Sequence, residues 1–261
     1  MTNGAERAVA DGPKSEIRIV ADEAALHDAA AHAVAAALVG AAADGARPSV
    51  ALSGGTTPRG VYAALAAGAR DRMPVPWERV EVFWSDERHV PPTHPDSNYR
   101  MARESLLSRV PIADAHVHRI RGEDPDPIAT AARYGAEVRS VIGTTDGVPR
   151  FDLVLLGLGA DGHTASLFPG SSALAPDAPL VAAPWVEALQ ARRFTMTLPL
   201  LNAARVVMFL VAGAAKSQAV RDVLQPGPST SWLPARSVRP AGRLIWLVDR
   251  AAAAQLAPPL P

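Results

Sequence analysis

Short apolar runs alternate along the chain with longer segments in which apolar residues recur at helical spacing. We expect strands over the apolar runs at residues 16–20, 49–52, 80–84, 117–120, 151–156, 205–211 and 244–248. The intervening segments predict helices at residues 22–43, 98–109, 128–142 and 214–224, and one whose first turn contains Pro58. This alternation favours an α/β fold with helices on both faces of an open, mostly parallel sheet.

The length of the chain is compatible with one compact domain. We expect residues 15–254 of the 261-residue chain to form it, because no internal repeat or low-complexity linker divides them. Residues 1–14 are small and polar with no apolar core segment, so they predict a flexible N-terminal tail and not a secretory signal. Residues 255–261 are expected to form a short C-terminal tail.

Composition excludes several classes of function. Without cysteine the chain has no disulfide, no thiol nucleophile and no thiolate metal ligand. The 26 basic and 26 acidic residues cancel, and no arginine-dense stretch interleaved with aromatic residues predicts a nucleic-acid surface. No uninterrupted apolar run approaches the roughly 18 residues that span a bilayer. We expect a soluble, cytoplasmic protein that binds neither nucleic acid nor membrane, and the sequence leaves its protein partners open.

Polar motifs follow three of the predicted strands where each strand ends. These motifs are Ser53-Gly54-Gly55-Thr56-Thr57, Asp86-Glu87-Arg88 and Asp161-Gly162-His163. The charged stretch that starts at Asp86 is expected to be exposed. Because ligands of open α/β sheets bind beyond the carboxyl ends of the strands, the three motifs are expected to share one crevice.

The first motif favours phosphate binding. Gly54 and Gly55 let the backbone turn tightly, and the helix that starts after them offers free N–H groups and a positive dipole end. Arg88 adds a planar guanidinium, and Lys216 begins a later predicted helix as the only lysine outside the N-terminal tail. Each feature alone is also compatible with a capped turn, a surface ion pair or a solvated lysine. The prediction therefore depends on their convergence.

His163 is the best candidate for acid–base chemistry. Imidazole titrates near neutral pH, and the glycine-lined strand end leaves this ring within reach of a substrate. Asp161, two residues earlier, is placed to orient it. A lone histidine is more often structural, so that alternative stays open here. His116 and His118 alternate on one face but are expected to lack a nearby carboxylate partner, so we expect no metal site.

Gly157, Gly159 and Gly162 match the G-x-G-x-x-G pattern of dinucleotide-binding proteins, so an oxidoreductase has to be considered. Asp161 would put a carboxylate inside the loop that binds the pyrophosphate, and Pro169-Gly170 interrupts the next helix. No acidic residue ends a second strand about 20 positions later. We therefore expect no dinucleotide cofactor.

Four segments together resemble the 6-phosphogluconolactonases in order and spacing. They are Ser53-Gly54-Gly55-Thr56-Thr57-Pro58, Trp84-Ser85-Asp86-Glu87-Arg88, Ser97-Asn98-Tyr99-Arg100 and the run from Gly157 to Pro169. Residues 197–202 and 211–216 extend the similarity, which covers about residues 16–250. The resemblance implies a modified Rossmann-like sheet and no required cofactor. It also implies hydrolysis of 6-phospho-D-glucono-1,5-lactone to 6-phosphogluconate in the cytoplasmic oxidative pentose phosphate pathway.

The resemblance implies roles for individual residues as well. His163 is the expected base that activates water, with its ring oriented by Asp161. Asp86 and Asn98 are expected accessory residues. The residues expected to bind the substrate phosphate are Gly54, Gly55, Thr56, Thr57, Arg88 and Lys216.

Two alternative functions remain. The related glucosamine-6-phosphate deaminases and isomerases look similar at the Gly-Gly-Thr turn, the Asp-Glu pair and the Asp-Gly-His. They carry an aromatic residue where this chain has Arg88 and a glutamate where it has Phe168, and both differences favour the lactonase. A non-catalytic sugar-phosphate sensor could use the same phosphate site, but the chain has neither room nor basic charge for a DNA-binding domain.

Overall fold

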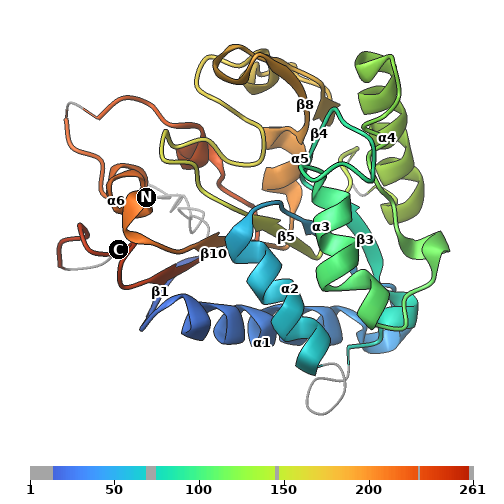
Figure 1. Ribbon diagram of the computed structural model, residues 1–261, viewed down its shortest axis with the longest axis horizontal. Helices are drawn as coiled ribbons and strands as arrows, with labels where there is room; N and C mark the ends of the chain where they lie inside the picture. The colour runs from blue at the N-terminus through green and yellow to red at the C-terminus, as the bar shows by residue number, and fades with distance from the viewer. Residues whose placement is uncertain (1–13, 69–74, 145–146, 229, 259–261) are drawn as a thin grey trace, which may run out of the picture.

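Six parallel strands form the central sheet (Figure 1). The structure, a computed structural model, describes residues 14–68, 75–144, 147–228 and 230–258. The sheet order is β1-β10-β9-β5-β2-β3. These strands are β1 (Lys14–Val20), β10 (Arg243–Asp249), β9 (Val206–Val211), β5 (Leu153–Leu156), β2 (Ser49–Leu52) and β3 (Glu81–Trp84). Strands β2, β3 and β5 are buried along their whole length, as expected for parallel strands covered on both faces.

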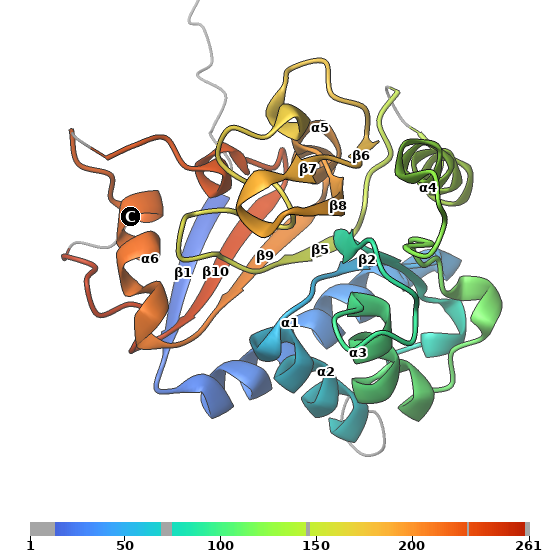
Figure 2. The same ribbon diagram turned by 45° about the horizontal axis from the view of Figure 1, so that its top comes forward.

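Helices lie on both sides of this sheet (Figure 2). On one side are α1 (Glu23–Ala41) and α2 (Thr56–Gly68), and on the other are α5 (Leu198–Ala203) and α6 (Ser217–Leu224). Two more helices, α3 (Asn98–Ser105) and α4 (Pro127–Ile142), lie near the β3 edge. The α/β fold predicted from the alternation of strands and helices is confirmed.

A second, antiparallel sheet was not predicted from the sequence. It consists of β4 (Asp86–Arg88), β8 (Ala191–Met196) and β6 (Val181–Ala182), with β7 (Trp185–Val186) pairing β8. The sequence analysis assigned no strand to these segments. In Figure 2 this small sheet lies on the opposite side of the central sheet from α1 and α2.

The expectation that the charged stretch after β3 is exposed was wrong. Asp86 and Glu87 are buried within β4, and only Arg88 of the three is partly exposed. Burial is possible because β4 pairs with β8 and because both carboxylates accept several hydrogen bonds.

Three other predicted elements differ from the structure. The strand expected at residues 117–120 is reduced to a single bridge between Val82 and Val117. The helix expected to reach residue 109 ends at Ser105 and continues as a 3₁₀ turn at Leu107–Arg109. The helix expected from residue 214 begins with the 3₁₀ turn Ala214–Lys216.

The two predicted tails can be compared with the structure only in part. The N-terminal tail expected at residues 1–14 lies outside the described residues except for Lys14, which begins β1. The C-terminal tail expected at 255–261 is described as far as Pro258. Within it Gln255 donates a hydrogen bond to Ser217 and Ala257 donates one to Gln225, so this part packs against α6.

Helix α1 is long and apolar enough to cross a membrane by length and composition. Its apolar residues Leu26, Val34 and Leu38 are buried in the core, and the helix packs against α2 and β10. Asp22 caps its first turn by accepting a hydrogen bond from Ala25 N at 2.9 Å. These contacts place α1 against the sheet and α2.

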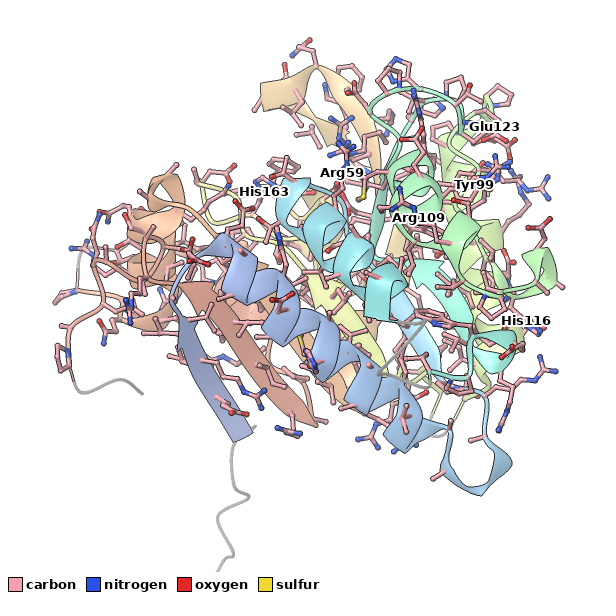
Figure 3. The ribbon with its side chains drawn as sticks, turned by 60° about the horizontal axis from the view of Figure 1, so that its bottom comes forward. Arg59, Tyr99, Arg109, His116, Glu123 and His163 are labelled. Atoms are coloured by element: carbon pink, nitrogen blue, oxygen red, sulfur yellow. The ribbon has the colours of Figure 1, made fainter. Side chains whose placement is uncertain are left out.

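A buried ionic cluster holds the start of β3, at the far end of the molecule from His163 (Figure 3). His118 contacts the Glu81 carboxylate through Nε2 (2.9 Å) and the Glu137 carboxylate through Nδ1 (2.8 Å), while His116 and Arg47 also contact Glu81. The expectation that the two histidines have no carboxylate partner was therefore wrong. Both partners come from elements distant in the sequence.

The cluster makes a pH-dependent contribution to stability. Burial favours neutral His118, but its hydrogen bonds to Glu137 and Glu81 outweigh burial and raise the pKa of His118. Burial likewise disfavours the Glu81 carboxylate, but hydrogen bonds from His118, Arg47 and His116 lower the pKa of Glu81. The Glu81 contribution is lost as pH falls through its lowered pKa, and the His118 contribution is lost as pH rises through its raised pKa.

We expect His118→Gln to lower the free energy of unfolding by about 1–3 kcal/mol at pH 5.5, because a buried carboxylate loses a charged partner. The His118 contribution is fully present below the ordinary histidine pKa of about 6.5, so the difference from wild type is expected to shrink at pH 9. Urea unfolding at both pH values measures it. The control is His32→Gln, since His32 is exposed on α1, and the free energy of unfolding is expected to change little. A difference independent of pH would contradict the assignment.

Candidate active site

A cavity of about 380 Å³ opens at the carboxyl ends of β2, β5 and β9. Six predicted site residues line it. Five come from the three motifs, namely Gly54, Gly55, Asp86, Arg88 and His163, and the sixth is Lys216. Residues more than 150 positions apart in the chain therefore meet in one crevice, as the strand-end argument predicted.

His163 and Asp161 form a hydrogen-bonded pair at the end of β5. The Nδ1 atom of His163 lies 2.5 Å from Oδ1 of Asp161, and the same oxygen accepts the backbone N–H of His163 at 3.2 Å. Burial would raise the pKa of Asp161, but the charge and hydrogen bonds of His163 outweigh it and lower that pKa. Asp161 is thus an ionised partner for Nδ1, and Nε2 is the ring nitrogen that can exchange a proton with a ligand.

Gly159 leaves the room that this pair occupies. A Cβ atom at position 159 would overlap Nδ1 of His163 and lie 2.5 Å from Oδ1 of Asp161. The backbone of Gly159 also closes the turn, because its N–H donates to the carbonyl of His163 at 2.8 Å. The glycines that resemble a dinucleotide loop therefore make space for an acid–base pair.

Asn98 does not line the cavity but contacts Asp86, which does. Its Nδ2 donates to the carbonyl of Asp86 at 2.9 Å and lies 3.3 Å from the Asp86 carboxylate. A Cβ atom at Gly54 would overlap the Asn98 amide, so this glycine is needed for close packing. Asp86 itself faces the cavity, and its Oδ2 accepts a hydrogen bond from Ser166 Oγ at 2.8 Å.

The turn after β2 is built as a phosphate site would require. Gly55 has φ +108°, which only glycine adopts readily, and α2 begins directly after it at Thr56. Thr57 Oγ1 donates to Glu23 on α1 at 3.4 Å, so its hydroxyl points away from the cavity. Neither threonine lines the cavity, and their predicted contribution is confined to the backbone at the helix start.

Glu87 fixes the segment that carries Asp86 and Arg88. Its buried carboxylate accepts four hydrogen bonds, two from backbone N–H groups at the start of α3. The donors are Arg88 N (2.7 Å), Asn98 N (2.8 Å), Tyr99 N (2.8 Å) and Ser97 Oγ (3.0 Å). Burial raises the pKa of Glu87 although these hydrogen bonds oppose the shift. All four partners are donors, and the carboxyl group donates to none. This indicates that Glu87 is ionised in the folded protein.

Arg193 is a cavity residue that the sequence analysis missed. It lies on β8 directly opposite Arg88 of β4, and both side chains line the cavity. Burial and the neighbouring Arg88 guanidinium lower the pKa of Arg193. The alternation from residue 193 to 197 could have indicated this strand, because Phe194 and Met196 are buried apolar residues and Arg193 shares a face with Thr195.

Ser53 also lines the cavity without having been predicted as a site residue of its own. Its hydroxyl is buried and has no hydrogen-bond partner within the described ranges. At the cavity wall this hydroxyl can pair with a polar ligand or with water. Among the described residues no group of three or more His, Asp or Glu side chains is arranged to hold a metal ion.

Comparison with known proteins identifies the family. A family model described as glucosamine-6-phosphate isomerases/6-phosphogluconolactonase matches residues 21–246. The chain belongs to this family. A 6-phosphogluconolactonase from Synechocystis is 44% identical over 80% of this chain and 85% of the relative, and one from Nostoc is 38% identical over 93% and 99%. A solved 6-phosphogluconolactonase structure from Trypanosoma brucei has a TM-score of 0.80 at 32% identity, covering 94% and 99% of the two chains.

We expect Glu87→Gln to lower the free energy of unfolding by about 2–3 kcal/mol. One carboxylate oxygen that accepts two hydrogen bonds is replaced by an amide nitrogen that can only donate. Urea unfolding at pH 7 measures the change. Glu104→Gln is the matched control on α3, since Glu104 makes an exposed ion pair with Arg100, and it is expected to have little effect. Equal stability of Glu87→Gln and wild type would show that the four hydrogen bonds are not what holds β4 to α3.

Proposed function

We propose that this chain hydrolyses 6-phospho-D-glucono-1,5-lactone to 6-phosphogluconate in the oxidative pentose phosphate pathway, and that it acts in the cytoplasm. The observation that carries the proposal is the His163–Asp161 pair, which borders a cavity that also collects three cationic side chains. A base beside a phosphate site is what hydrolysis of a phosphorylated lactone needs. Relatives with this activity support the same conclusion.

The phosphate is anchored by the cationic side of the cavity. Arg88 and Arg193 offer planar donors, Lys216 offers an ammonium, and the Gly54-Gly55 turn offers backbone N–H groups at the start of α2. An anchor at one end of the substrate fixes the position of the lactone carbonyl relative to His163. Such positioning converts the attack of water into an effectively intramolecular step.

His163 then acts twice. Its neutral Nε2 removes a proton from water while the water oxygen attacks the lactone carbonyl carbon. When the tetrahedral intermediate collapses, the bond from this carbon to the ring oxygen breaks, and the imidazolium returns the proton to the departing oxygen. Ionised Asp161 holds the ring and stabilises the imidazolium between the two steps. The chemistry requires no cofactor.

Asp86, Ser166 and Ser53 bring oxygen atoms to the same cavity. The Asp86 carboxylate already accepts hydrogen bonds from Ser166 and Asn98, and it retains lone pairs for hydroxyl groups of a sugar ring. The unpartnered Ser53 hydroxyl can donate to or accept from the ligand. We assign these residues to substrate orientation, not to proton transfer.

Deamination of an amino-sugar phosphate is the competing function within this family. Ring opening of that substrate uses the glutamate that the deaminases carry five residues after the histidine. Here that position is Phe168, whose ring stacks on His163 with centroids 4.1 Å apart. An apolar ring occupies the place of the carboxylate, and this favours lactone hydrolysis.

The first test follows acid release from freshly prepared 6-phosphogluconolactone at neutral pH against its spontaneous hydrolysis. We expect wild type to accelerate the reaction and His163→Ala to lose at least about 100-fold in kcat, the size of a general-base contribution. Circular dichroism checks that the variant is folded. Ammonia release from glucosamine 6-phosphate, with no effect on the lactone, would support the deaminase instead.

A second test asks whether Arg193 binds the phosphate or only adds positive charge to β8. We expect Arg193→Gln to raise KM for the lactone about 10- to 100-fold, because a charge-assisted hydrogen bond to phosphate is lost. Arg192→Gln is the matched control, since Arg192 precedes it on β8 but donates to the carbonyl of Ala183, away from the cavity. Equal KM values for the two variants would remove Arg193 from the phosphate site.

A further inference from the structure

Phe168 lies flat against the catalytic histidine. The ring centroids of Phe168 and His163 are 4.1 Å apart and their planes differ by 26°. His163 is thus held by Asp161 through Nδ1 at one edge of the ring and by Phe168 across one face. Gly159 leaves room for His163 and Asp161.

A tight turn brings Phe168 back to His163. The turn is closed by a hydrogen bond from Leu167 N to Thr164 O at 2.9 Å, and Thr164 Oγ1 donates to the carbonyl of Gly157. Ala165 has φ +47°, a left-handed conformation that costs a residue with a Cβ atom. The fold thus retains an unfavourable backbone conformation in the turn that delivers Phe168.

Packing into the core does not account for this placement. Leu167, the preceding residue, is fully buried and fills the core, whereas Phe168 is partly exposed. The Phe168 side chain instead borders two cavities. One is the catalytic cavity, and the other is a neighbouring cavity of about 370 Å³ that reaches Asp161 and Trp185. The ring therefore stands between the face of His163 and a second space beside its carboxylate partner.

We propose that Phe168 is a positioning residue that fixes the plane of the His163 ring and separates the catalytic cavity from its neighbour. A hydrogen bond at Nδ1 alone still leaves the imidazole some freedom of rotation about its Cβ–Cγ bond. The stacked ring removes this freedom and directs Nε2 toward the catalytic cavity. This inference rests on the proposed lactonase function and adds a residue that acts through His163 without touching the reacting atoms.

The test compares variants that keep or remove the aromatic face. Phe168→Leu keeps an apolar side chain but removes the stack, and we expect kcat to fall about 10- to 100-fold with KM unchanged within about twofold, because small errors in the position of a catalytic group are costly. Phe168→Tyr keeps the stack and is expected to retain kcat. Trp185→Leu is the control, since it removes an exposed aromatic residue from the far side of the neighbouring cavity.

Folding is checked by cooperative thermal unfolding, and calorimetric binding of the product 6-phosphogluconate reports on the cavity. We expect product affinity to be unchanged in Phe168→Leu. If that variant fails to fold, Phe168→Met replaces it as the non-aromatic variant. An unchanged kcat in the folded non-aromatic variant would overturn the inference, as would a loss confined to KM or an equal loss in Phe168→Tyr.

These outcomes are distinct from failure of the proposed function. If wild type does not accelerate lactone hydrolysis, or if His163→Ala retains full kcat, the lactonase proposal and the positioning role fall together. If both hold and Phe168→Leu matches wild type, only the positioning role is lost.

Discussion

The buried carboxylate of Glu87 is the interaction on which the cavity depends. Four donors from β4 and the start of α3 converge on it. The charge is expensive to bury, so the segment is stable only when all four donors are in place. In that arrangement its neighbours Asp86 and Arg88 face the cavity, and Asn98 is brought beneath Asp86 and against Gly54. One constraint thus couples the acidic, cationic and glycine-rich parts of the site.

The two sheets contribute different things to this site. The central parallel sheet supplies rigid strand ends, from which the Gly54-Gly55 turn and the His163 turn extend. The small antiparallel sheet supplies Arg88 and Arg193 as a directly opposed pair. Like charges opposite each other destabilise a sheet. The carboxylates of Asp86, Asp96 and Glu87 offset this only in part, since the pKa of Arg193 is still lowered by burial and by Arg88. The arrangement fits the phosphate site proposed above.

Much of the fold and site could be predicted because the signals are local. Apolar runs such as 49–52 and 153–156 set the parallel strands, and the convergence of strand ends followed from topology. Most of the small sheet could not be predicted in this way, because β4 is charged and β6 and β7 are only two residues long. Only β8 has an alternating pattern that could have indicated a strand. Burial of Glu87 and the contacts of His118 with Glu81 depend on partners from other elements, which no local pattern reveals.

The site residues differ in the same way. His163, Asp161, Arg88 and Lys216 were predicted because their chemistry is visible in their side chains. Phe168 was noted only for the carboxylate it replaces, because an aromatic residue in an apolar run ordinarily indicates core packing. Its role becomes apparent only when the turn at Ala165 places it on the imidazole face. A catalytic histidine needs a hydrogen-bond partner for one ring nitrogen and a fixed orientation of its ring. The sequence motif shows the partner, Asp161, whereas the orientation depends on the fold.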